Sequence, residues 1–276
     1  MYSLAFSPCP NDTFIFDALV QGRTGSLKNL LDVHLEDVES LNRKAMRGVY
    51  DVTKLSFSAW LRVAGRYQIL SAGGALGRGN GPLLVARPGI RARQLESSRI
   101  AIPGTLTTAN LLLTLAYPDA KSRQEYLFSE IPEVLKRGDA EAGVLIHETR
   151  FLYRELGLEL IQDLGSFWEE LTRLPIPLGC IAVRRSLPLE VKQQFNVEIR
   201  ESLLYAMDHP GASSDFIREH AQEMDESIIR AHVSTFVNEF SVALGEEGKM
   251  AVAALGNMAL SRGWIDRLPE EPWVID

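Results

Sequence analysis

A titratable side chain follows the apolar end of a short predicted strand midway along the chain. Residues 141–150 read EAGVLIHETR, in which Val144, Leu145 and Ile146 are followed directly by His147. An unperturbed imidazole titrates near neutral pH, which suits a general base, and α/β sheets bind ligands beyond the carboxyl ends of their strands. His147 is therefore a candidate base at the mouth of a site, although a packed structural histidine is the commoner explanation of the residues alone.

Three polar clusters each precede a predicted helix: SPCPNDT at 7–13, TKLS at 53–56 and PGTLTTA at 103–109. The N-terminus of a helix offers unpaired N–H groups and a partial positive charge, to which Ser and Thr hydroxyls add further donors. Three such ends around one cleft would bind a carboxylate or a polyhydroxylated ligand. Ordinary N-capping explains each cluster equally well, so only their convergence in space would indicate a site.

Two other motifs have both a structural and a functional interpretation. The loop GGALGRGNGP at 73–82 lacks the ending of a phosphate-binding P-loop and the strand–helix context of a dinucleotide fingerprint. We expect a tight or mobile connection there, and the alternative is a ligand-facing loop in which Arg78 pairs with a carboxylate. The aromatic pair Phe167-Trp168 predicts ordinary packing, with stacking on a planar ligand as the alternative.

The remaining residue types exclude several common chemistries. The two cysteines, Cys9 and Cys180, do not make a disulfide framework, and neither has another metal ligand at the usual spacing. No HExxH motif and no GxSxG motif occurs. The other histidines show no zinc-ligand spacing either: His34, His209, His220 and His232.

The bulk composition predicts an ordinary globular protein. The chain has 276 residues, a formal charge of −7, and 46% hydrophobic and 24% charged residues, and its length suggests about two domains. The acidic balance argues against nonspecific binding to nucleic acid. No secretory signal and no apolar run of roughly 18 residues is present. We expect a cytoplasmic protein, although the mature form of an exported one would look the same.

Hydrophobic patterns predict an α/β fold with mainly parallel sheets and a helical last third. Strands are expected at 2–7, 32–37, 51–55, 68–71, 82–87, 99–103, 126–128, 143–146, 160–162 and 180–184. Helices are expected at 13–21, 41–48, 57–64, 107–116, 131–137, 187–206, 214–222, 226–237 and 246–261. The first of these helices has Asn11 or Asp12 as its candidate N-cap.

Seven stretches, in the expected order, resemble the 1,4-dihydroxy-6-naphthoate synthase family of the futalosine route to menaquinone. They are SPCPNDTFIF (7–16), LEDVESLNR (35–43), TKLS (53–56), GGALGRGNGP (73–82), PGxxTTA (103–109), LIHETRF (145–151) and LPIPLG (174–179). The resemblance covers most of residues 1–240 and is weakest over the last thirty. It is far more specific than any single motif above.

The resemblance implies an α/β, two-domain fold of the periplasmic-binding-protein type II kind, with a ligand cleft between the domains. The larger domain would comprise residues 1–86 plus 182–276, including the C-terminal helices. The smaller domain would comprise residues 87–181. The candidate crossover strands are 82–87 and 180–184.

The resemblance also implies a lyase that converts cyclic dehypoxanthinyl futalosine to 1,4-dihydroxy-6-naphthoate and dihydroxyacetone, without a metal or an organic cofactor. The family's proton-abstracting histidine falls on His147. Its substrate-contacting segments fall on Lys54, Leu55, Ser56, Thr108 and Ala109. The implied partner is a small-molecule carboxylate substrate, with no nucleic acid, no membrane and no obligate protein partner. The individual roles of Arg78, Arg150 and Trp168 stay open.

Two other functions fit the same fold. A solute-binding protein for a small anion would use the cleft without chemistry and would return its ligand unchanged. A chorismate dehydratase would belong to the same pathway but would act on chorismate. His147 within LIHETR favours the lyase over a passive receptor.

Overall fold

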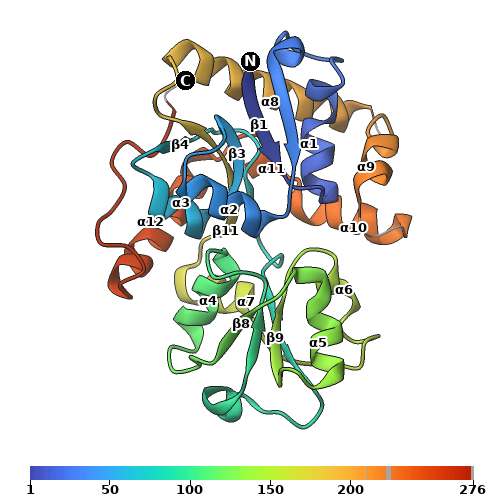
Figure 1. The fold of residues 1–276 in the computed structure, drawn as a ribbon, viewed down its shortest axis with the longest axis vertical. Coiled ribbons are helices and arrows are strands. Elements are labelled where there is room, and N and C mark those ends of the chain that lie inside the picture. The colour runs from blue at the N-terminus through green and yellow to red at the C-terminus, as the bar shows by residue number, and fades with distance from the viewer. Residues whose placement is uncertain (210, 222–224, 275–276) are drawn as a thin grey trace.

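The computed structural model describes residues 1–209, 211–221 and 225–274, and its strands form two sheets. The first sheet has the order β2 (Leu31–Leu35), β1 (Tyr2–Phe6), β3 (Val52–Ser56), β11 (Ile176–Arg184) and β4 (Tyr67–Ile69), and β5 (Ala75–Gly77) pairs with β11. The second sheet has the order β10 (Glu159–Asp163), β6 (Leu83–Ala86), β9 (Ala142–Leu145), β7 (Ile100–Ile102) and β8 (Arg123–Glu125). The sheets lie in the upper and lower parts of Figure 1.

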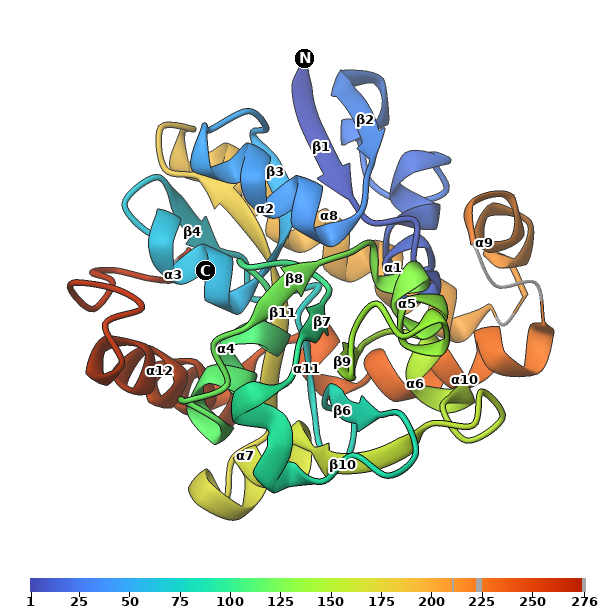
Figure 2. The same cartoon turned by 60° about the horizontal axis from the view of Figure 1, so that its bottom comes forward.

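Each sheet and the helices around it are called a lobe here. The first lobe contains α1 (Pro10–Val20), α2 (Val38–Met46), α3 (Phe57–Val63), α8 (Leu189–Asp208), α9 (Ser214–His220), α10 (Glu226–Phe236), α11 (Glu239–Val242) and α12 (Gly245–Ser261). The second lobe contains α4 (Thr108–Ala116), α5 (Ile131–Arg137), α6 (Thr149–Leu152) and α7 (Leu164–Thr172). Figure 2 shows the second lobe in front of the first.

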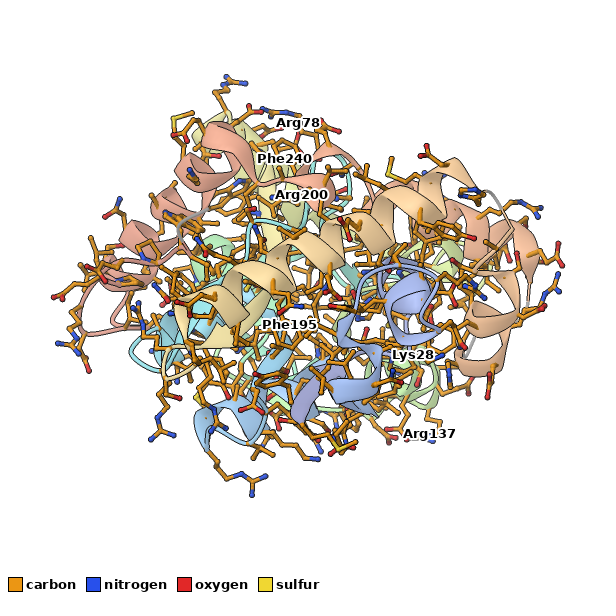
Figure 3. All side chains as sticks on the ribbon, turned by 90° about the horizontal axis from the view of Figure 1, so that it is seen from above. Lys28, Arg78, Arg137, Phe195, Arg200 and Phe240 are labelled. Carbon is orange, nitrogen blue, oxygen red and sulfur yellow. The ribbon has the colours of Figure 1, made fainter. Side chains whose placement is uncertain are left out.

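The long helix α8 fixes the start of the chain. Ser202 Oγ donates to the Ile15 carbonyl at 2.6 Å and accepts from the Leu19 amide at 3.0 Å, so α8 and α1 are tied by side-chain as well as apolar contacts. Figure 3 labels Phe195 and Arg200 along α8. The ring of Phe195 is fully buried, and Arg200 donates to Ser71 Oγ at 2.7 Å.

One hydrophobic cluster runs through both lobes. It includes Trp60 of α3, which is 1% exposed, and Trp168 of α7, which is 0% exposed, together with the apolar face of α4. Burial of large aromatic side chains is worth several kcal/mol each. Apolar packing therefore holds the two lobes against each other beside the cavity described below.

The sheets are mixed, so the prediction of mainly parallel sheets is wrong. Among the pairings of the described strands, four are parallel and five are antiparallel. The chain enters the second sheet along β6 and returns to the first along β11. Each of these two strands runs against its neighbours, and the antiparallel pairs all involve one of them. The alternation of strands and helices along the sequence does not show that a strand will run antiparallel to its neighbours when the chain passes from one sheet to the other.

Several local predictions also need correction. The strand expected at 126–128 is wrong: β8 ends at Glu125 and residues 128–130 form a 3-10 helix. Helix α1 begins at Pro10 with Cys9 as its N-cap, because Pro is favoured in the first helical turn. Asn11 and Asp12 therefore lie inside the helix and are not its caps. The structure adds β5, α6, α7 and α11, which the patterns did not predict. Gln222, the expected end of α9, lies outside the described residues.

The proposed domain boundaries stay a prediction. Residues 83–86 are the first strand of the second sheet, and residues 176–184 form a strand of the first sheet. Both expected crossover segments thus lie in strands at the passage between the sheets. In the described part of the chain, no helix is both long and apolar enough to cross a membrane.

Candidate active site

A cavity with an empty volume of about 670 Å³ is lined by residues of both lobes. The lining includes members of all three polar clusters and the candidate base: Ser7, Asn11, Asp12, Lys54, Leu55, Ser56, Thr107, Thr108, Ala109 and His147. Every site residue predicted from the sequence is therefore in one place. N-capping alone does not predict this convergence, whereas a ligand site does.

His147 is the second residue after β9 and has a strained backbone. Its φ is 53°, in the left-handed region that non-glycine residues rarely adopt. Its ring is edge-on to Phe128, with centroids 4.8 Å apart, and is stacked on His232 at 5.9 Å with an interplanar angle of 8°. Among the described residues, neither ring nitrogen of His147 has a hydrogen-bond partner. The ring is thus oriented by packing, and a nitrogen remains available to a ligand in the cavity.

The surroundings of His147 keep its imidazole neutral. Burial lowers its pKa from 6.5 to about 4. The Glu148 carboxylate opposes this shift, the neighbouring His232 adds to it, and Asp12 and Lys54 have smaller opposing influences. Part of the residue reaches the cavity, but protein groups surround the ring. A neutral imidazole at neutral pH is the form that a general base needs.

Lys54 lines the cavity together with the carboxylate that it pairs with. Its Nζ lies 2.5 Å from Asp12 Oδ1, and their side chains are 7% and 1% exposed. Asp12 also accepts from Ser7 Oγ at 2.6 Å and from Asn11 Nδ2 at 2.8 Å. The charge of Lys54 is therefore neutralised by the protein. The ammonium of Lys54 is therefore not an open anion site.

Ser56 precedes α3 without capping it. Its side chain makes no capping hydrogen bond, and its Oγ accepts from Asn42 Nδ2 at 3.1 Å. Because an accepting hydroxyl keeps its own proton, Ser56 Oγ can still donate into the cavity. The capping explanation, which the sequence left open, is wrong for this residue.

The helix α4 offers amides more than hydroxyls. Thr107 caps it, with Oγ1 accepting from the Asn110 amide at 3.2 Å. Thr108 Oγ1 donates to the Leu178 carbonyl at 2.9 Å and accepts from the Ser58 amide at 3.2 Å. The first amides of a helix have no intrahelical partner. Thr108 and Ala109 occupy the first positions of α4 and line the cavity, so their N–H groups are candidate donors to a ligand.

Arg150 is a second cation of the lining. Its Nη2 donates to the Gly79 carbonyl at 3.1 Å, and its closest carboxylate oxygen, on Asp163, is 3.9 Å away. Its Nε is buried and has no hydrogen-bond partner in the described part of the chain. Burial lowers the pKa of Arg150. A guanidinium with spare donors is suited to a ligand oxygen, and no sequence motif singled it out beyond its place in LIHETRF.

Arg78 and Trp168 do not line the cavity. Arg78 is half-exposed and donates to Glu247 Oε1 at 2.7 Å. Trp168 is fully buried, with Nε1 donating to the Pro175 carbonyl at 2.9 Å. Stacking of Trp168 on a ligand is therefore wrong, and packing is confirmed. The glycine-rich loop has both roles, since part of it is β5 and Asn80 and Gly81 line the cavity.

Sequence reasoning missed the polar neighbours of the candidate base. His232 of α10 is fully buried behind His147, and Glu148 is 6% exposed. The sequence marks His232 only as a polar residue on the buried side of a helix. It marks Glu148 only as a carboxylate next to the candidate base. In residues 1–209, 211–221 and 225–274, no group of three or more His, Cys, Asp or Glu side chains is placed to hold a metal ion.

Comparison with solved structures shows the fold. A protein from Archaeoglobus fulgidus is 35% identical, with a TM-score of 0.90 over 96% of this chain and 98% of that chain. The ligand-binding component of an ABC-type import system from Staphylococcus aureus has a TM-score of 0.70 at 11% identity, over 99% and 96% of the two chains. The periplasmic aliphatic sulphonate binding protein from Escherichia coli has a TM-score of 0.65 at 8% identity, over 98% and 90%. The expected periplasmic-binding-protein fold is confirmed.

Comparison with known sequences shows the family. A family model described as menaquinone biosynthesis matches residues 2–260. A 1,4-dihydroxy-6-naphthoate synthase from Thermus thermophilus is 49% identical over 94% of both chains. Another from Streptomyces coelicolor is 40% identical over 96% of this chain and 95% of that one. With these matches over nearly its whole length, the chain belongs to the menaquinone biosynthesis family, alongside the 1,4-dihydroxy-6-naphthoate synthases.

Proposed function

We propose that this enzyme is a carbon–carbon lyase that converts cyclic dehypoxanthinyl futalosine to 1,4-dihydroxy-6-naphthoate and dihydroxyacetone, with His147 as the general base. The observation that carries the proposal is a neutral imidazole with an available nitrogen, in a cavity that also gathers the predicted binding segments. The relatives named 1,4-dihydroxy-6-naphthoate synthase support the product. A cytoplasmic location and the lack of an obligate protein partner belong to the proposal and stay predictions.

In this proposal His147 takes a proton from the substrate. The electron pair that held this proton then drives cleavage of the carbon–carbon bond to the sugar-derived fragment. Aromatisation of the new ring follows. Positioned proton transfer is worth about 10² to 10⁴ in rate. The surroundings keep the imidazole unprotonated at neutral pH, as a base must be when the step begins, and the lowered pKa also makes it a weaker base than a free imidazole.

The substrate carboxylate would bind where donors converge. Ser56, Thr108 and Ala109 all line the cavity, their hydroxyl and amide groups are donors of the kind a carboxylate needs, and the α4 N-terminus adds a partial positive charge. Lys54 contributes indirectly because its charge is paired with Asp12. Arg150, whose side chain is a cation of the cavity lining, would face another oxygen of the substrate.

Incubation of the purified protein with cyclic dehypoxanthinyl futalosine, followed by mass spectrometry, tests the proposal. The wild type should release the naphthoate and dihydroxyacetone. His147→Asn keeps size and polarity but removes the base, so it should bind the substrate and turn it over at least about 10²-fold more slowly. Turnover of His147→Asn at the wild-type rate would remove His147 from the role of base.

Passive binding is the second candidate, because the fold is shared with ligand-binding components of import systems. It predicts that the wild type returns the same compound intact. Incubation with chorismate separates the third candidate, a chorismate dehydratase. Loss of water from chorismate, with no naphthoate from the futalosine compound, would overturn the proposed lyase.

A further inference from the structure

A buried histidine of the first lobe touches groups from both lobes. His232 of α10 is 0% exposed. Its Nε2 lies 2.9 Å from Asn11 Oδ1, in the first turn of α1. Its Nδ1 lies 3.4 Å from Oε2 of Glu148, which follows β9 in the second lobe. His232 therefore bridges the lobes at the wall of the cavity.

One hydrogen bond and one charge contact place a proton on each ring nitrogen of His232. Asn11 Nδ2 donates to Asp12 Oδ1 at 2.8 Å, so the other amide atom, Oδ1, faces His232 as an acceptor. Nε2 must then carry a proton. Nδ1 faces a carboxylate oxygen, and an unprotonated nitrogen there would set a lone pair against a negative charge. A proton on Nδ1 instead makes an attractive, charge-assisted contact.

Glu148 is ionised in this arrangement. Burial on its own raises the pKa of Glu148, but the contacts with His232 and His147 outweigh it and hold the pKa below the ordinary value. Glu148 Oε2 and His232 Nδ1 are both buried, and neither has a hydrogen-bond partner among the described residues, so their ion-pair contact at 3.4 Å is what each has in its place. Each is therefore the group that compensates the burial of the other.

The same bridge reaches the candidate base in two ways. The ring of His232 is parallel to that of His147, with centroids 5.9 Å apart, and so forms a flat support behind it. Glu148 is also the next residue in the chain. Its contact with His232 anchors the backbone just after His147, whose φ of 53° needs such a constraint.

We infer that His232 is a positioning residue for the proposed reaction: as an imidazolium held between Asn11 and Glu148, it ties the two lobes together and orients the ring of His147. This inference rests on the proposed role of His147 as the base. The other charged groups near the two rings are Asp12 and Lys54, which are paired with each other. His232 and Glu148 are therefore the remaining charged pair beside His147, and replacing either one leaves the charge of the other uncompensated there.

The first test uses the ligand-free wild type. Nitrogen NMR of protein labelled in its histidines distinguishes an imidazolium from either neutral tautomer. We expect both ring nitrogens of His232 to be protonated at about pH 7, and those of His147 to show a neutral ring. A neutral tautomer at His232 would overturn the inference, whatever the protein does to its substrate.

The second test compares His232→Phe, which keeps a flat ring without nitrogens, with Glu148→Gln, which keeps the shape without the charge. Loss of the cation should raise the titration midpoint of His147, and loss of the anion should lower it. If His232 and Glu148 served only as packing, their replacements would not shift the titration midpoint of His147 in opposite directions. Both variants should lose about 10²-fold in kcat with KM within about twofold, because the base is misplaced while the binding groups remain.

His209→Phe is the matched control, because its ring also stacks on a neighbour, Tyr205, but lies outside the cavity. It should change neither the midpoint nor kcat. Folded variants at His232 and Glu148 with wild-type midpoints and kcat would overturn the inference. If the wild type turns over no substrate, the proposed function fails separately, and the NMR midpoints still decide the positioning role. If a variant does not fold, the wild-type spectrum decides it.

Discussion

Lys54 Nζ lies 2.5 Å from Asp12 Oδ1, and this ion pair is almost completely buried at the cavity. The pair joins β3 to the first turn of α1, so it fixes two of the three polar clusters relative to each other. It also removes the most obvious cation from the set that could meet a substrate carboxylate. The proposed binding therefore depends on Ser56, on the amides of Thr108 and Ala109, and on Arg150.

Replacing Lys54 with Met should destabilise the protein strongly. The change leaves Asp12 buried without its cation, which costs about 3 to 5 kcal/mol in the free energy of unfolding. Urea denaturation measures this cost. Lys249→Met is the control, because Lys249 pairs with Glu246 on the surface and should lose less than about 1 kcal/mol. A second change, Asp12→Asn in the Lys54→Met background, should recover part of the loss, and equal losses for Lys54→Met and Lys249→Met would contradict the prediction.

Replacing Ser56 with Ala should weaken substrate binding with little effect on stability. Ser56 does not cap α3, so the helix keeps its N-terminal contacts, and Asn42 retains Glu39 as a partner for its Nδ2 at 3.3 Å. Loss of one hydrogen bond to the substrate should cost about 0.5 to 1.5 kcal/mol in binding. Calorimetric titration of substrate into a His147→Asn background avoids turnover.

Thr107→Ala is the matched control for Ser56. Thr107 caps α4, so its loss should cost about 0.5 to 2 kcal/mol of folding stability. The two variants thus separate a binding hydroxyl from a capping one. Unchanged affinity in Ser56→Ala would restrict Ser56 to its contact with Asn42.

Local patterns predict most of the elements and the site, and the reason is physical. A strand end, a cap cluster and a glycine-rich turn are each encoded by neighbouring residues, so the positions of Ser56, Thr108 and His147 at the ends of elements follow from the sequence alone. The resemblance to a known family then assigns them to one cleft. The structure confirms that they meet there, while their roles remain proposals.

The features that sequence reasoning missed depend on distant parts of the chain. His232 meets Asn11 across a separation of 221 residues, and no local pattern carries that information. The direction of β11 is set by the return from the second sheet, which strand–helix alternation does not encode. The pattern around Trp168 does not decide between packing and ligand stacking for the same reason, because the hydrophobic cluster that contains it draws residues from both lobes.

Replacing Gly81 with Ala should distort the passage between the lobes. A Cβ on Gly81 would lie 2.3 Å from Gly165 Cα and 2.4 Å from Gly165 N, both of which are backbone atoms. Overpacking of this kind costs about 1 to 3 kcal/mol, and it shifts a residue that lines the cavity. Urea denaturation should therefore show a loss of stability. Gly65→Ala, where nothing lies within 4 Å of the new Cβ, should stay within about 0.5 kcal/mol of the wild type, and the same result for Gly81→Ala would contradict the prediction.

The lowered pKa of His147 predicts an unusual pH dependence of turnover. A base is active when deprotonated, and burial lowers the pKa of His147 to about 4. The acidic limb of kcat/KM should therefore fall near pH 4 and not near 6.5, where an ordinary imidazole would place it. Rates between about pH 7 and pH 5 should stay nearly constant.

Circular dichroism at each pH separates this limb from acid unfolding. His34→Gln serves as the control, since His34 lies outside the cavity and its replacement should leave the profile unchanged. His232→Phe should move the limb to higher pH, because the cation that opposes protonation of His147 is gone. A wild-type limb near pH 6.5, with the protein still folded, would show that the ring of His147 is hydrated and would contradict the lowered pKa.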